Sequence, residues 1–186
     1  YGKAKDKPAV FTVSDSLLRD ATRTAADFRN KTLLAFDKKD VTGLEIVLDG
    51  ERMSVEPEAE SKWKITKPVS LRADAEAISD LLDKLRFTKV KEFPADAPKS
   101  LARYGLDRPA RVTIFLGKEK DRTSQALLLG NEEPAKQGVY AMRPGESSVL
   151  LVGDDIWKAL PKTVGALRNK TVVDYDRDKV AGLEVE

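Results

Sequence analysis

Phe28-Arg29-Asn30-Lys31-Thr32 occurs a second time as Leu167-Arg168-Asn169-Lys170-Thr171, and the two copies are 139 positions apart. The same offset aligns further pairs without a gap: Tyr1 with Tyr140, Asp15 with Asp154, and Gly43 with Gly182. Residues 1–46 therefore repeat residues 140–185. We predict that residues 41–186 form one complete repeat unit followed by the first strand of the next unit. Residues 1–40 are expected to be the C-terminal part of a preceding unit.

Each copy has the same predicted local order. A short apolar run is followed by a helix, for which Ser14-Asp15 and Asp154 offer N-caps. Arg-Asn-Lys-Thr then ends the helix, since Asn tolerates the left-handed conformation and basic residues favour the negative end of the helix dipole. A strand is expected next, over residues 32–36 and 171–175. The alternative is a shared anion or partner contact, which makes Arg29, Lys31, Arg168 and Lys170 candidate binding residues.

Between the two copies, the pattern predicts an α+β fold. Apolar and polar residues alternate from Val41 to Leu48, and Asp49-Gly50 indicates a hairpin with return strands over 52–55 and 62–66. An amphipathic helix is expected from Asp74, with apolar positions at Ile78, Leu81, Leu82 and Leu85. A short helix ended by Gly105 follows in the proline-containing stretch 87–110.

Four more strands are predicted at 111–116, 125–129, 138–142 and 148–152, separated by turn residues and not by helices. Strands joined in this way pair antiparallel, whereas parallel strands need long crossovers. We therefore expect mostly antiparallel sheets with a few amphipathic helices packed on them.

Composition excludes several chemistries. The 186-residue chain has no cysteine and no histidine, which removes disulfides, thiolate nucleophiles, the commonest general base and the commonest transition-metal ligand. A net charge of +2 with interspersed signs argues against nucleic-acid binding. The longest apolar runs are too short to span a bilayer. We expect no cofactor, no nucleic acid and no membrane contact by this stretch itself, which we interpret as a fragment of a longer protein.

The chain resembles the domain of unknown function family 4340, which occurs in bacterial proteins. The most specific feature is Tyr104-Gly105-Leu106 followed by Pro109. Other matching features are Trp63 with Ile65 and Pro68, Leu81-Leu82 with Leu85, residues 112–116, Leu129-Gly130, Val139-Tyr140 and the segment 168–180. The resemblance covers residues 41–186, and residues 1–40 match the end of a preceding unit. It implies an extracytoplasmic or periplasmic, membrane-tethered protein encoded beside gliding-motility-type ABC transporter components, with no known reaction.

Three functions remain open. The first is a non-enzymatic extracytoplasmic module that binds a protein partner of the cell envelope, such as a transporter component, or a surface polymer, because repeated units multiply binding surface. The second is a small-ligand or polymer carrier with a cleft between subdomains, lined by Trp63, Tyr104 and Trp157. The third is a carboxylate-based hydrolase, for which the chain has many Asp and Glu residues but no recognisable catalytic motif.

Overall fold

The computed structural model describes residues 1–59, 62–117, 119–171, 179, 181–182 and 184. The chain divides into two compact units, Tyr1–Lys31 and Thr32–Glu186. The larger unit is an antiparallel β-sheet with helices on it, which confirms the expected α+β class.

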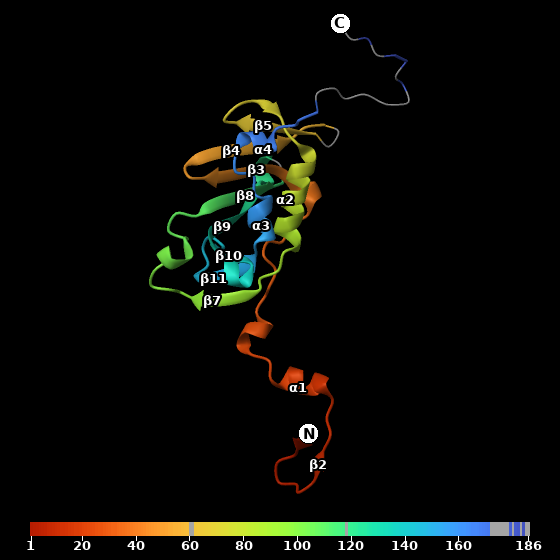
Figure 1. The fold of residues 1–186 in the computed structure, drawn as a ribbon, viewed down its shortest axis with the longest axis vertical. Helices are drawn as coiled ribbons and strands as arrows, with labels where there is room; N and C mark the ends of the chain where they lie inside the picture. Colours follow the sequence, from red (N-terminus) through yellow and green to blue (C-terminus); the bar gives the residue numbers. More distant parts are fainter. Residues whose placement is uncertain (60–61, 118, 172–178, 180, 183, 185–186) are drawn as a thin grey trace. The chain divides into compact units, whose positions relative to one another are not determined.

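One nine-stranded sheet forms the larger unit, in the order β6-β5-β4-β3-β8-β9-β10-β11-β7 (Figure 1). Every neighbouring pair is antiparallel. The strands are β3 (Val41–Leu48), β4 (Glu51–Pro57), β5 (Trp63–Lys67), β6 (Leu71–Arg72), β7 (Glu92–Asp96), β8 (Ala110–Leu116), β9 (Thr123–Glu133), β10 (Gly138–Met142) and β11 (Ser148–Gly153). The three-strand meander and the four later strands expected from the sequence are confirmed.

The first hairpin shows why this pattern forms a sheet. Asp49 and Gly50 have φ of 50° and 85°, which the turn between β3 and β4 requires and which glycine adopts without strain. In the strand before it, Leu44 and Ile46 are buried beneath the helices, while Glu45 between them is only partly covered. Alternating residues therefore place one face of the sheet in the core.

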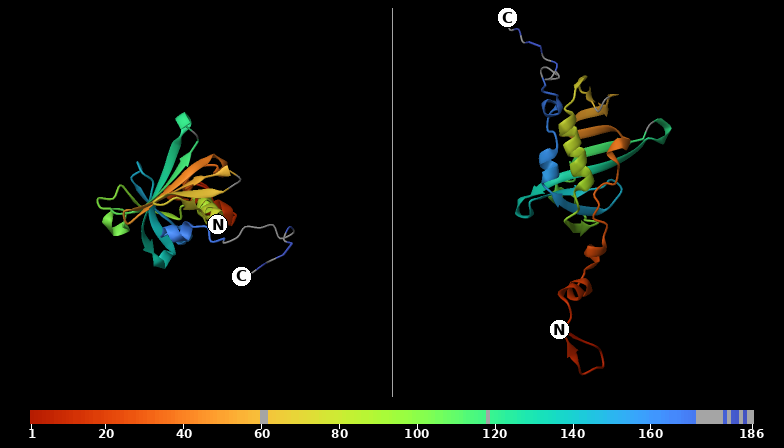
Figure 2. Two further views of the ribbon diagram at one scale, coloured as in Figure 1. Left: turned by 90° about the horizontal axis from the view of Figure 1, so that it is seen from above. Right: turned by 90° about the vertical axis from the view of Figure 1, so that its right-hand side faces the viewer.

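The main helix, α2 (Ala75–Phe87), covers that apolar face (Figure 2). Asp74 caps it by accepting hydrogen bonds from the backbone N–H groups of Glu76 and Ala77 at 3.0 and 3.1 Å. Its buried residues are those predicted from helical spacing: Ile78, Leu81, Leu82 and Leu85. The shorter helices α3 (Asp155–Ala159) and α4 (Val164–Leu167) complete this layer, with Ile156 and Leu167 in the same core.

The prediction of a strand over residues 32–36 is wrong. Leu33 and Leu34 are buried, but the segment forms no strand: Thr32 makes an isolated bridge with Lys89, and side chains bond other backbone groups. Arg143 donates to the carbonyls of Thr32 and Leu33 at 2.7 and 2.8 Å, and the Gln125 amide exchanges two hydrogen bonds with the backbone of Ala35. The corresponding expectation for residues 171–175 falls mostly outside the described residues.

Two further expectations need correction. The proline-containing stretch 87–110 includes strand β7, which the sequence did not predict; it lies at the sheet edge, where Pro94 is tolerated. Asp154 does not cap α3 with its side chain, because its carboxylate instead accepts from Lys158 Nζ at 2.7 Å. In the first copy, Ser14 is the cap and Asp15 is the first helical residue.

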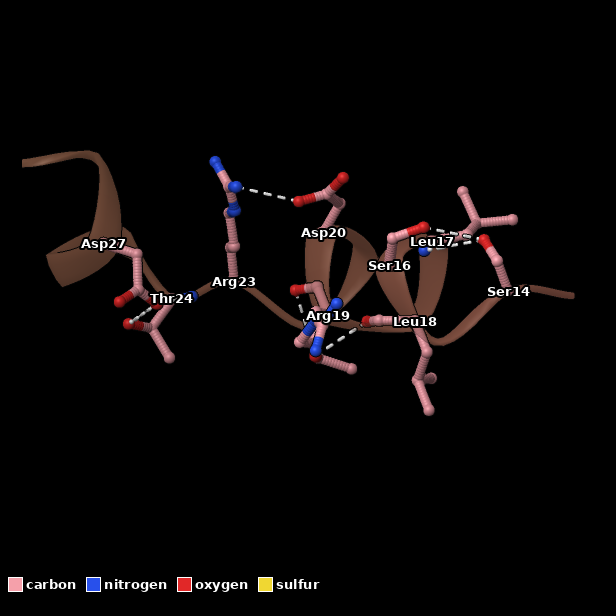
Figure 3. A network of polar contacts seen from close by, with 10 residues as sticks. Ser14, Ser16, Leu17, Leu18, Arg19, Asp20, Arg23, Thr24 and Asp27 are labelled. Atoms are coloured by element: carbon pink, nitrogen blue, oxygen red, sulfur yellow. Dashed lines mark hydrogen bonds and ion pairs between the residues drawn. The ribbon is translucent and has the colours of Figure 1, made fainter.

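The smaller unit contains a two-stranded sheet, β1 (Gly2–Lys3) with β2 (Val10–Phe11), then α1 (Asp15–Ala21) and a 3₁₀ turn, η1 (Ala25–Phe28). Short-range bonds hold its helices (Figure 3). Ser14 Oγ accepts from the Leu17 N–H at 3.4 Å, and Asp27 accepts from both the N–H and the hydroxyl of Thr24 at 2.7 and 2.8 Å. Its interactions are thus mainly local in sequence.

Candidate binding groove

The Tyr104-Gly105-Leu106 element packs on the face of the sheet opposite α2. The 3₁₀ turn η4 (Ala102–Tyr104) ends at Gly105, whose φ of 67° confirms the left-handed cap expected there. Tyr104 and Leu106 are buried against Val149, which forms a second, smaller hydrophobic cluster. Only 4% of Tyr104 is exposed, so its ring is packed in this cluster and is not an open binding surface.

Two tyrosines meet in this second cluster. The Tyr104 and Tyr140 rings form an edge-to-face pair with centroids 5.0 Å apart, a favourable aromatic geometry. Tyr140 Oη donates to Glu133 Oε2 at 2.7 Å. This hydrogen bond, together with burial and the negative charge of Glu133, raises the pKa of Tyr140 above its usual 10.0.

A pH dependence of stability follows from this bond. A raised folded-state pKa means that the contribution of Tyr140 is fully present below the unfolded-state pKa of about 10 and is lost as pH rises through the folded value. The free energy of unfolding should therefore fall more steeply above pH 10 in the wild type than in Tyr140→Phe. Urea denaturation of both proteins at pH 9 and above pH 10 measures the difference. Parallel pH profiles would contradict this role of Tyr140.

Gly130 in strand β9 allows the backbone of Tyr104 and Gly105 to approach this strand closely. A Cβ on Gly130 would overlap the carbonyl oxygen of Tyr104 and lie 3.0 Å from the carbonyl carbon of Gly105. The β9–β10 register also shifts between Val139 and Ala141, opposite this point. A glycine within a strand is a signal for such a close backbone approach.

Beside this contact is an open groove of about 550 Å³ at one end of the sheet. Its walls come from the β3–β4 turn, the segment before β8, the part of β9 around Gly130, and α3 with the residues that follow it. Its lining includes Asp49, Gly105, Arg108, Gly130, Asn131, Glu132, Trp157 and Lys162. Most of the polar members are exposed, so the groove is open to solvent and not an enclosed cavity.

Trp157 and Lys162 form the most specific contact in the groove. The Lys162 ammonium lies 3.2 Å from the centroid of the Trp157 ring, a cation–π arrangement. Partial burial against this surface lowers the pKa of Lys162, and the negative charge of Glu132 opposes the shift. The open surface thus presents the Trp157 ring, the Lys162 ammonium and the Arg108 guanidinium. These groups suit a ligand that has both anionic and apolar groups.

The structure separates the residues expected to share a cleft. Trp157 lines the groove, whereas Tyr104 is not among its lining residues and its ring packs on Tyr140. Trp63 is half-buried in β5, and strands β4, β3 and β8 lie between β5 and β9. The groove residues Arg108, Asn131, Glu132 and Lys162 were not predicted, and the glycine within strand β9 was the available signal.

The candidate basic residues lie at unit ends. Arg168 and Lys170 are exposed and follow α4, where Arg168 forms an isolated bridge with Ala73. Arg29 and Lys31 are half-buried at the end of the smaller unit. Their role in binding stays a prediction.

The chain matches the family "Domain of unknown function (DUF4340)" over residues 1–62 and again over residues 63–186. It belongs to this family. The two successive matches support the internal repeat in part. No match was found among the curated proteins or among the solved structures.

Two kinds of feature are absent from the described residues. Within those residues, no helix combines the length and apolar character that crossing a membrane requires. In the same part of the chain, no three His, Cys, Asp or Glu side chains gather as a metal site.

Proposed function

We propose that this DUF4340 chain is a non-enzymatic binding module on the outer side of the cytoplasmic membrane, tethered through another part of its protein. Its partner is a protein of the cell envelope, such as a component of a neighbouring ABC transporter. The repetition of residues 1–46 as residues 140–185, together with two successive family matches, supports a role in which binding surface is multiplied.

The observation that carries the proposal is the Trp157–Lys162 stack beside Arg108 in the open groove. Tryptophan and arginine are the residue types that most often dominate binding energy at protein interfaces. Asp49, Arg108 and Lys162 are exposed, so the groove offers a surface contact. Small-molecule sites, by contrast, enclose most of the ligand surface.

A capture experiment tests the proposal. The chain is immobilised and incubated with solubilised envelope of bacteria that encode it, and bound transporter components are quantified. We expect Arg108→Glu with Lys162→Glu to reduce recovery about 10-fold or more, because central charged contacts cost about 1.4 kcal/mol or more when reversed.

Matched variants identify the surface. Lys39→Glu with Lys99→Glu makes the same change in net charge at two exposed lysines outside the groove, and recovery should be retained. Arg168→Glu with Lys170→Glu tests the basic residues chosen from the repeat. Equal recovery with the groove variant and the control would exclude the groove, and failure of the wild-type chain to recover a transporter component or an envelope polymer would exclude the function.

A further inference from the structure

Large apolar side chains are exposed in the smaller unit. Val10, Phe11, Leu17, Leu18 and Phe28 are each between 48% and 72% exposed. A shift of 139 positions places them on Val149, Leu150, Ile156, Trp157 and Leu167. Four of these counterparts are at most 1% exposed, and Trp157 is half-buried against the main core. The positions are apolar in both copies, but only the second copy buries them.

The two copies also share backbone structure. In the β1–β2 hairpin Gly2 is opposite Phe11, and in the β10–β11 hairpin Ala141 is opposite Leu150, the same pairing after the shift. Helix α1 corresponds to α3, and η1 (Ala25–Phe28) corresponds residue for residue to α4 (Val164–Leu167). The smaller unit is therefore a hairpin and two helical turns built like residues 140–170.

In the larger unit, residues 32–139 cover the second copy. Strand β10 pairs with β9, and β11 pairs with β7, so both outer edges of the hairpin are bonded. Helix α3 lies beside α2, with Asp155 Oδ2 3.3 Å from Lys84 Nζ. The carbonyl of Leu167 accepts from the Asp74 N–H at 2.7 Å.

Among the described residues, β1 and β2 pair only with each other, so neither outer edge of this hairpin is bonded to a further strand. A two-stranded hairpin is marginally stable in water, and a unit of about 30 residues is too small to bury a core without disulfides, metals or association. The chain has no cysteine. The exposed apolar side chains therefore need a covering surface.

We propose that residues 1–31 are the C-terminal part of a second DUF4340 unit, and that their exposed apolar face docks on a sheet and long helix equivalent to residues 32–139. This occupant is the preceding unit of the same polypeptide, joined to Tyr1 as Val139 is joined to Tyr140. Phe11 and Leu17 then enter its core as Leu150 and Ile156 do here. The inference does not depend on the envelope partner proposed above.

A second copy of the chain is a weaker occupant. In each copy, the surface in question already holds its own residues 140–170. Those residues are covalently attached and so act at a high effective concentration, which an exchanging segment from another molecule must overcome.

The test adds the proposed covering surface at the position that the 139-residue repeat predicts. A chain with an extra copy of residues 32–139 directly before Tyr1 is compared with the 186-residue chain by amide hydrogen exchange. We expect protection of residues 10–28 to rise about 100-fold or more, because they join a cooperative core. Leu17→Glu should abolish this gain. Arg19→Glu should preserve it, because the counterpart of Arg19, Lys158, is exposed.

Unchanged exchange at residues 10–28 beside a protected copy of α2 would overturn the proposal. Concentration-dependent protection in the 186-residue chain alone would also overturn it, because two copies would then be exchanging segments. If the added copy of α2 is itself unprotected, the added surface has not folded, and a second chain is measured instead. In this second chain, residues 1–31 replace residues 140–170. Cooperative unfolding of that chain supports the docking, and its absence overturns it.

Discussion

Ile78→Ala should lower the free energy of unfolding by about 2–5 kcal/mol. Ile78 is fully buried on the face of α2 that lies against the sheet, together with Leu81, Leu82 and Leu85. Removing its outer carbons forfeits their transfer free energy and leaves a cavity that the packed sheet beneath cannot fill. Urea denaturation followed by far-UV circular dichroism measures the loss as a lower midpoint at unchanged slope.

Asp80→Ala on the same helix is the matched control. Asp80 is exposed, so the change should alter stability by no more than about 0.5 kcal/mol. If Ile78→Ala is as mild as Asp80→Ala, α2 does not pack on the sheet as described.

Gly130→Ala is expected to destabilise the larger unit by about 1–3 kcal/mol, the usual cost of forcing extra atoms into a packed site. The new Cβ would overlap the Tyr104 carbonyl oxygen, which belongs to the backbone and cannot rotate away. Either β9 or the Tyr104-Gly105 segment must move, and both contribute to the groove. Thermal unfolding measures the stability, and the capture experiment on the same variant reports the effect on binding.

Gly165→Ala controls for the loss of a glycine. Gly165 lies in α4, and a Cβ added there would have Thr163 Oγ1 as its nearest neighbour at 3.7 Å, an ordinary contact. Alanine has the higher helix propensity, so this variant should be as stable as the wild type or up to about 1 kcal/mol more stable. Equal effects of the two substitutions would show that Gly130 is not a close-approach site.

Local pattern predicted most of the fold. The strands from Val41 to Val152 alternate apolar and polar residues or carry turn residues at their ends, and α2 has four apolar residues at helical spacing. Strand β7 was missed because Glu92–Asp96 carries a proline and two acidic residues; pairing with β11 at the sheet edge, and not its own propensity, makes it a strand. Residues 32–36 were assigned to a strand because Leu33, Leu34 and Phe36 are apolar, but in the structure this segment forms no strand.

The groove was less accessible to prediction. Trp157 was singled out, but the aromatic residues chosen with it point elsewhere, because Tyr104 packs on Tyr140 and Trp63 belongs to β5. Arg108, Glu132 and Lys162 come from three separate stretches of chain that meet only after the sheet has formed. No spacing in the sequence signals that meeting.

The sequence by itself determined the 139-residue repeat, the antiparallel α+β class and the family. These depend on residue identity and short-range periodicity, which can be counted along the chain. Only the tertiary structure decided that Leu150 and Ile156 are buried while Phe11 and Leu17, at the same repeat positions, are exposed. Burial depends on a covering surface from elsewhere in the molecule, and residues 32–139 supply that surface to residues 140–170 through β9, β7 and α2.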